Sequence, residues 1–133
     1  MTILVLDPGG TTGWALFKDG RVTAGDFPNW SQVAHLIEFF KPEVIVAESF
    51  YLYLGKARQL SGNTFVPAEV LGVIKYLGET WNIPVKLIHP SAKKGFPLRK
   101  GAVHGSQHAR DAARIGLAYL DQAGLRGYEA LLA

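Results

Sequence analysis

The chain has 133 residues, of which 48% are hydrophobic and 19% charged, with a net charge of +3, and this profile indicates one globular domain over residues 1–133 with its own core. It contains no cysteine, which excludes disulfides and thiolate metal sites. No stretch reaches the roughly 18 apolar residues of a membrane helix, and no basic start precedes an apolar run at the N-terminus, so we expect a cytoplasmic protein without a signal peptide.

The first quarter of the chain predicts three strands. An apolar run at residues 2–7 predicts a short buried strand, and Pro8-Gly9-Gly10 marks the end of that strand. Residues 13–18 and 21–26 predict two further strands, which an Asp19-Gly20 hairpin turn would join.

A helix and a buried strand are predicted next. Either Asn29 or Ser31 can cap the helix, and Pro42 closes it. Its apolar positions follow helical spacing: Val33, Leu36, Ile37 and Phe40. Residues 43–47 form a β-branched run that predicts a buried strand, with Glu48 just beyond its apolar part.

The second half of the chain alternates loops with regular elements. Residues 49–63 predict a loop or a ragged helix start, and a helix follows at 67–81 and a strand at 84–88. Residues 89–105 predict a loop that is mobile without a ligand. Ser106 can cap a last helix that runs to about residue 123. The order β-β-β-α-β-α-β-α predicts a mixed five-stranded sheet flanked by helices in one α/β domain.

Three acidic residues stand where such a sheet would present them together. Asp7 ends the first strand and Glu48 ends the strand at 43–47. If these two strands are parallel neighbours, their carboxyl ends place both side chains side by side, where α/β proteins usually bind ligands. Asp111 lies early in the last helix, and His108 shares its face because the two are three residues apart.

Carboxylates with one imidazole form a donor set that suits Mg²⁺ or Mn²⁺. Two such ions, about 3.5–4 Å apart, can clamp a scissile phosphate, and Asp7 is the natural bridging ligand. Taken singly, each residue has a plain structural explanation: Asp7 as a turn residue, Glu48 and His108 as surface residues, Asp111 as a partner of the helix dipole. Their joint occurrence favours a metal centre.

Basic residues are concentrated in one part of the chain. Between Lys86 and Arg114 there are seven Lys or Arg residues and a single acid, Asp111. Clustered bases are what a phosphate-backbone partner needs, because each neutralised phosphate releases counterions. A solvated face is the alternative interpretation of this cluster.

The motifs around these residues resemble the RuvC-type Holliday junction resolvases, particularly the short RuvC-like proteins of bacteriophages. The matching segments are the first strand with its Asp-Pro-Gly turn, the glutamate strand and the last helix, at residues 3–15, 44–50 and 108–114. They occur in the same order over nearly the whole chain. The resemblance implies a ribonuclease H-like fold.

The same resemblance implies the site. Asp7, Glu48, His108 and Asp111 correspond to the catalytic tetrad, which binds two divalent cations, Mg²⁺ or Mn²⁺. Lys94 is our match for a basic residue near the cleaved phosphate. Many relatives carry an acid where His108 stands, and a neutral imidazole there lowers the negative charge of the site.

The resemblance also implies the partners: a homodimer that cuts opposing strands of a four-way DNA junction in the bacterial cytoplasm, as part of recombination and repair. Tyr51 corresponds to an aromatic wedge, and stacking a base on such a ring contributes roughly 1–3 kcal/mol. The expected DNA-binding residues are Tyr51, Lys56, Arg58, Lys93, Lys94, Arg99, Lys100 and Arg110.

Three other functions stay open at this point. Residues 7–13 also resemble the phosphate-binding turn of the actin, Hsp70 and sugar-kinase superfamily, in which Gly amides and Thr hydroxyls hold ATP, although those proteins need a second domain. A non-catalytic DNA-binding module would use the basic loop alone. A ribonuclease H-like nuclease for RNA–DNA hybrids is the third, because a fold does not determine its substrate.

Overall fold

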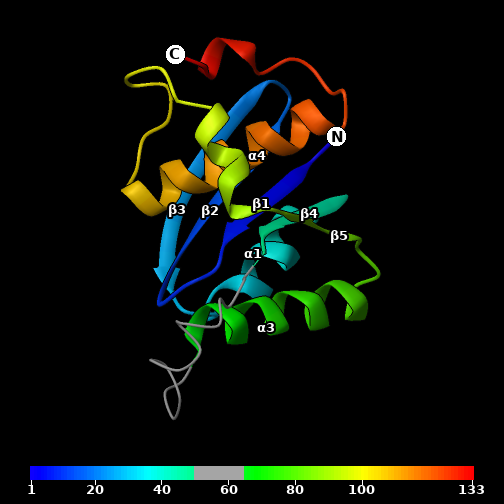
Figure 1. The fold of residues 1–133 in the computed structure, drawn as a ribbon. Coiled ribbons are helices and arrows are strands. Elements are labelled where there is room, and N and C mark those ends of the chain that lie inside the picture. The colour runs from blue at the N-terminus through cyan, green and yellow to red at the C-terminus, as the bar shows by residue number, and fades with distance from the viewer. Residues whose placement is uncertain (50–64) are drawn as a thin grey trace.

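The computed structural model describes residues 1–49 and 65–133. Within these residues the strands are β1 (Ile3–Asp7), β2 (Thr11–Lys18), β3 (Arg21–Pro28), β4 (Val44–Glu48) and β5 (Val85–Ile88). The helices are α1 (Val33–Phe40), α3 (Val66–Thr80) and α4 (Gln107–Gln122), with short 3₁₀ helices η1 (Pro90–Gly95) and η2 (Glu129–Leu131) (Figure 1). None of the helices in the described residues is long and apolar enough to cross a membrane.

The five strands form one mixed sheet in the order β3-β2-β1-β4-β5. β2 pairs antiparallel with both β1 and β3, whereas β4 pairs parallel with both β1 and β5. This arrangement confirms the predicted mixed five-stranded sheet. Because β1 and β4 are parallel neighbours with Leu6 opposite Ala47, the next residue of each strand, Asp7 and Glu48, lies at the same edge.

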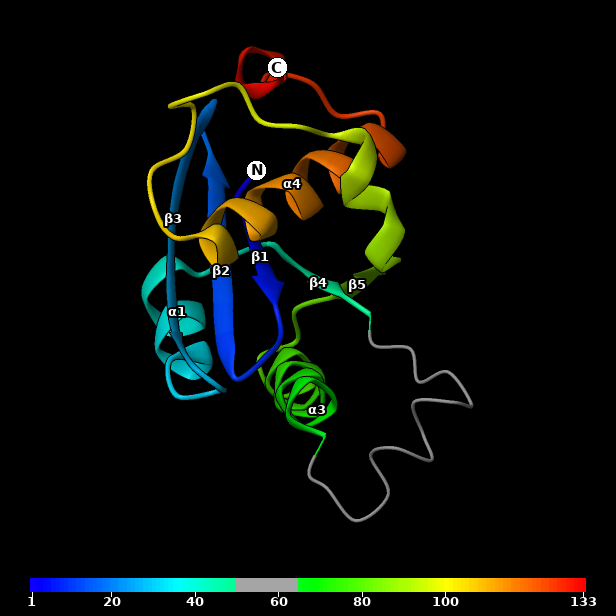
Figure 2. The same ribbon diagram turned by 60° about the vertical axis from the view of Figure 1, so that its left-hand side comes forward.

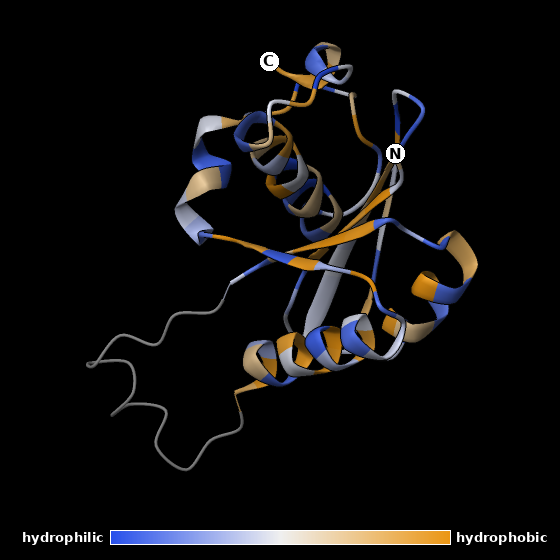
Figure 3. Cartoon of the chain, turned by 90° about the vertical axis from the view of Figure 1, so that its right-hand side faces the viewer, coloured by the Kyte–Doolittle hydropathy of each residue, from blue (hydrophilic) through white to orange (hydrophobic). Residues whose placement is uncertain are grey.

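Helices cover both faces of the sheet, as Figures 2 and 3 show. Side chains alternate between the faces of a strand, so Ile3 and Val5 of β1 pack on the α4 side, while Leu4 and Leu6 pack with α1 and α3. β4 alternates in the same way, with Val44 and Val46 on the α4 side. Asp7 and Glu48 continue these two rows and therefore face α4.

Two glycines let α4 approach the sheet closely. A Cβ on Gly13 of β2 would lie 1.9 Å from the His108 carbonyl oxygen, and a Cβ on Gly116 of α4 would lie 2.3 Å from the Phe17 ring. Gly13 is the partner of Asp7 across the β1–β2 pair. The close approach at Gly13 thus brings the first turn of α4 to the sheet beside Asp7.

The predicted ends of the helices are partly confirmed. Ser106 caps α4 as expected, since its Oγ accepts a hydrogen bond from Ala109 N at 3.2 Å. The prediction for α1 was wrong: Gln32 is its N-cap residue and makes no capping hydrogen bond. Asn29 Oδ1 instead accepts from Trp30 N, and Ser31 Oγ donates to the Pro28 carbonyl.

The basic segment at 89–105 makes regular contacts that the sequence did not predict. It begins with η1, which packs against α4. Its later part is held by the C-terminal segment, because Leu98 forms a β-bridge with Leu132 and Arg99 N donates to Leu131 O at 2.7 Å. This segment therefore has fixed contacts with the rest of the domain.

Candidate active site

Three carboxyl groups converge at one edge of the sheet. Asp7 and Glu48 come from adjacent parallel strands, and Asp111 comes from α4, which covers the same face. Asp7 shares a side-chain hydrogen bond with Glu48 and experiences the negative charges of both Glu48 and Asp111. The structure therefore places Asp7 in contact with Glu48 and Asp111 within electrostatic range of Asp7, and their assignment as metal ligands stays a prediction.

The environment of Asp7 strongly disfavours its charged form. Burial is the largest cause, followed by the hydrogen bond with Glu48 and the Glu48 charge, and together these raise the pKa of Asp7 from 3.8 to about 8. The Lys93 charge acts in the opposite direction and is outweighed. Such a cluster of partly buried carboxylates is stable in its ionised form only when a cation neutralises it.

Lys93 is a basic residue that contacts Glu48. Its Nζ lies 3.3 Å from Glu48 Oε2 and 3.4 Å from Oε1, and the Glu48 side chain is 11% exposed. Lys94, which the sequence favoured, is exposed on the same 3₁₀ helix. In a 3₁₀ helix, only residues three apart share a face, so the adjacent Lys93 and Lys94 lie on different faces of η1.

Arg114 joins η1 to the acidic site. Its guanidinium donates to Lys93 O at 2.9 Å and to Phe96 O at 3.2 Å, and its Nη1 lies 3.5 Å from Asp111 Oδ1. Gln107 Nε2 also donates to Asp111 Oδ1 at 2.8 Å. Sequence reasoning counted Arg114 only as one of the clustered bases, yet it orients both an acid and the helix that carries Lys93.

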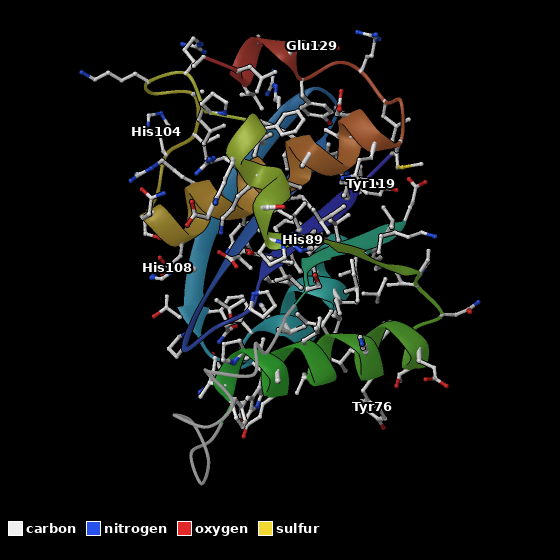
Figure 4. The ribbon with its side chains drawn as sticks, viewed as in Figure 1. Tyr76, His89, His104, His108, Tyr119 and Glu129 are labelled. Atoms are coloured by element: carbon white, nitrogen blue, oxygen red, sulfur yellow. The ribbon has the colours of Figure 1, made fainter. Side chains whose placement is uncertain are left out.

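His108 lies at the N-terminal end of the same helix as Asp111. It occupies the first turn of α4 with an exposed side chain (Figure 4). Within residues 1–49 and 65–133, no three His, Asp or Glu side chains are already grouped at metal-binding distances. The role of His108 as a ligand stays a prediction.

A second contact joins the start of α4 to β3, an edge strand of the sheet. Ser106 Oγ donates to Asp26 Oδ2 of β3 while it caps the helix. One hydroxyl thus fixes both the direction and the position of the first turn of α4. Because Asp111 lies on the next turn, this contact, which the sequence did not indicate, helps to place the third acid.

Hydrogen bonds of the buried Thr12 side chain stabilise the turn after Asp7. Thr12 is fully buried, and its Oγ1 donates to Asn29 O at 2.6 Å and accepts from Gly9 N at 3.3 Å. These bonds fix the Pro-Gly-Gly turn and, with it, the end of β1. They also occupy the Thr12 hydroxyl inside the fold, which argues against its use in holding a nucleotide phosphate.

A basic groove lies next to the acids. It has a volume of about 630 Å³, and its lining includes Arg99, Lys100, His104, Arg110 and Arg114 but no acidic residue among those described. Figure 4 places His104 on the loop before α4. The groove and the acidic site share Arg114, so the positive surface begins at the edge of the acidic cluster.

The predicted DNA-binding residues fall into three groups. Arg99, Lys100 and Arg110 line the groove. Lys93 faces Glu48, and Lys94 is exposed beside it. Tyr51, Lys56 and Arg58 lie outside the described residues.

The donor set fits a hard divalent cation. Asp7, Glu48 and Asp111 offer carboxylate oxygens, which Mg²⁺ and Mn²⁺ prefer. Their repulsion, seen in the raised pKa of Asp7, is the electrostatic condition that a cation would relieve. These residues are therefore suited to hold Mg²⁺ or Mn²⁺.

The fold is similar to those of known resolvases. It matches the structure of T. thermophilus RuvC in complex with a Holliday junction substrate with a TM-score of 0.70 and 16% identity, over 93% of this chain and 96% of that chain. Another Thermus thermophilus RuvC structure matches with a TM-score of 0.65 and 16% identity, over 93% of this chain and 97% of that chain. The yeast mitochondrial Holliday junction resolvase matches with a TM-score of 0.56 and 14% identity, over 89% and 77% of the two chains.

No protein-family model and no curated protein sequence matches the chain. At these identities the structural matches establish the architecture. The sheet order β3-β2-β1-β4-β5 with helices on both faces, shared with the RuvC structures, is the ribonuclease H-like fold.

Proposed function

We propose that this protein is a metal-dependent endonuclease that cleaves branched DNA, with the four-way junction as its principal substrate. The observation that carries the proposal is the convergence of Asp7, Glu48 and Asp111 from β1, β4 and α4 at one edge of the sheet. The fold supports it, because the similar T. thermophilus protein is a RuvC in complex with a Holliday junction substrate.

The acidic cluster is the proposed metal centre. Asp7, Glu48 and Asp111, together with His108, would hold two Mg²⁺ or Mn²⁺ ions, with Asp7 between them. Such ions supply Lewis-acid stabilisation of the scissile phosphate and activation of the attacking water. Gln107 and Arg114 orient the Asp111 carboxylate through their contacts with its Oδ1.

The basic groove is the proposed path of the DNA backbone. Arg99, Lys100 and Arg110 offer positive charge next to the acids, and contacts of this kind position a nucleic acid without reading its sequence. A second copy of the chain, related by a two-fold axis, would present a second site to the opposing strand of a junction. We therefore propose a homodimer as the active form.

A cleavage assay on four substrates tests the proposal. Labelled four-way junction, flap, linear duplex and RNA–DNA hybrid are incubated with the protein in Mg²⁺, in Mn²⁺ and in EDTA. We expect cleavage that requires a divalent cation and is fastest on the junction. Faster cleavage of the hybrid would replace the proposed substrate by RNA–DNA, and cleavage in EDTA would exclude the proposed chemistry.

Asp7→Asn provides the matched variant for this assay. It keeps the shape of the side chain but removes the charge from the centre of the acidic cluster, so cleavage should be abolished while DNA binding remains. Asp121→Asn, an exposed acid on α4, is the control and should cleave like the wild type. Full cleavage by Asp7→Asn would show that the acidic cluster is not the catalytic centre.

A further inference from the structure

The ammonium group of Lys93 is a positive charge inside the acidic site. Its Nζ contacts both Glu48 oxygens, at 3.3 and 3.4 Å, so the ammonium faces the two atoms that a metal ion would use. The Lys93 side chain is 23% exposed and the Glu48 side chain 11%. At this burial the attraction between the charges is screened less than at an open surface, and the Lys93 charge also reaches Asp7.

The position of Lys93 is set by the fold as well as by this ion pair. Arg114 donates to the carbonyl oxygens of Lys93 and Phe96, which anchors η1 on α4. Phe96 packs against the core beside α4. The backbone of Lys93 is thus anchored independently of the Glu48 contact, and the side chain reaches the acids from a fixed point.

We propose that Lys93 is an internal counter-ion of the site, which a divalent cation must displace from Glu48, so that Lys93 sets the affinity of the site for metal. The inference deepens the proposed metal-dependent function and rests on it. An ammonium and a divalent cation on the same carboxylate repel each other strongly at such short distances. The cost of breaking the Lys93–Glu48 pair therefore reduces the net free energy of metal binding.

Lys94 is a natural control for this proposal. It follows Lys93 on the same 3₁₀ helix and carries the same charge, but it is exposed to solvent. Substituting either lysine changes the net charge of the protein equally. A difference between the two variants therefore reports the local contact with Glu48 rather than the overall field.

The test is calorimetric titration of the full chain with Mn²⁺ and with Mg²⁺ in the absence of DNA. The proteins are the wild type, Lys93→Met, Lys93→Gln, Lys93→Arg and Lys94→Met. We expect Lys93→Met and Lys93→Gln to bind metal at least about threefold more tightly than the wild type. Even an exposed ion pair contributes up to about 1 kcal/mol, and this contribution no longer opposes metal binding in these variants. Lys93→Arg, which keeps the charge, and Lys94→Met should stay near the wild-type affinity.

Thermal melting supplies a second measurement on the same proteins. Without metal, Lys93→Met should melt below the wild type, because the carboxylates lose a counter-ion. Saturating Mn²⁺ should raise its melting temperature by more than it raises that of the wild type. Lys93→Gln gives the same comparison if Lys93→Met folds poorly.

The outcomes separate the inference from the function on which it rests. Unchanged or weaker metal binding by both neutral Lys93 variants, with normal binding by the wild type, would overturn the counter-ion role and leave the metal centre intact. An equal gain in affinity for Lys94→Met would also overturn it. Absence of metal binding in every protein, the wild type included, would overturn the proposed function itself and the inference with it.

Discussion

At the scale of single residues, the proposed chemistry depends on how Asp7 is surrounded. The residue ends a short buried strand and is followed by a Pro-Gly-Gly turn, which by itself is compatible with a simple turn role. Its burial beside Glu48, with Asp111 within electrostatic reach, raises its pKa to about 8. A carboxyl group in this state binds a proton or a cation, which is the behaviour expected of a metal ligand in its metal-free form.

The pKa of Asp7 makes the stability of the metal-free protein depend on pH. The folded pKa of about 8 lies above the ordinary value of 3.8, so between these values the folded state binds more protons than the unfolded state. Stability from this group is complete below about pH 4, declines as the pH rises, and is lost above about pH 8. Each pKa unit between the two states corresponds to about 1.4 kcal/mol.

Urea unfolding in EDTA at pH 5, 6, 7 and 8 measures this dependence. Asp7→Asn should be more stable than the wild type at pH 8, by roughly 1 kcal/mol or more, and its stability should change less between pH 5 and 8. Mg²⁺ should restore stability to the wild type at pH 8, because it favours the ionised carboxyl. Parallel pH profiles for the two proteins would contradict the assigned environment of Asp7.

At the scale of elements, α4 and the 3₁₀ helix η1 build the site on the sheet. Ser106 ties the start of α4 to Asp26, and Arg114 ties η1 to α4. The capping serine was predicted from the sequence because it acts within four residues. The contact between Lys93 and Glu48 joins residues 45 positions apart, and no local pattern predicts which of two adjacent lysines makes it.

The close packing of α4 on the sheet leaves no room for a side chain at one glycine of the helix, Gly116. Ala has a higher helix propensity than Gly by up to about 1 kcal/mol. Gly116→Ala should nevertheless destabilise the protein, because the new Cβ would lie 2.3 Å from the Phe17 ring. The expected cost is about 1–3 kcal/mol, which is typical of an overpacked core.

Gly72→Ala is the matched control, since Gly72 is in α3 and a Cβ there comes within 4 Å of no neighbouring group in residues 1–49 and 65–133. This substitution should leave stability unchanged or raise it by up to about 1 kcal/mol. Chemical denaturation of both variants makes the comparison. Equal effects at Gly116 and Gly72 would mean that α4 lies farther from the sheet than described.

At the scale of the whole molecule, the two faces of the sheet have different surfaces. The basic groove lies on the α4 side, beside the acidic site. α1 and α3 cover the other side, where Phe39 and Tyr76 are exposed. This difference gives the molecule one face suited to a phosphate backbone.

The proposed DNA-binding face can be tested through the salt dependence of binding. Replacing Lys100 and Arg110 with Gln removes two charges from the groove. The slope of log K against log salt for junction binding should fall by about 0.9 for each phosphate that the protein no longer neutralises. Binding is measured by fluorescence anisotropy at several salt concentrations in EDTA.

Lys41→Gln with Lys75→Gln removes the same net charge from α1 and α3 and serves as the control. Lys41 follows α1 and Lys75 lies on α3, on the opposite face. The control should keep the wild-type slope, because these lysines lie away from the groove. If both pairs lower the slope alike, the groove is an ordinary solvated surface.

The sequence alone determined the strands, the alternation of their side chains and the approximate ends of the main helices, because these depend on local spacing. It also predicted that Asp7 and Glu48 lie side by side if their strands are parallel neighbours, and the structure supplied that pairing. Only the tertiary structure decided that Lys93 rather than Lys94 faces Glu48 and that Arg114 connects η1 to Asp111. Those choices depend on contacts between distant segments, which exist only after the chain has folded.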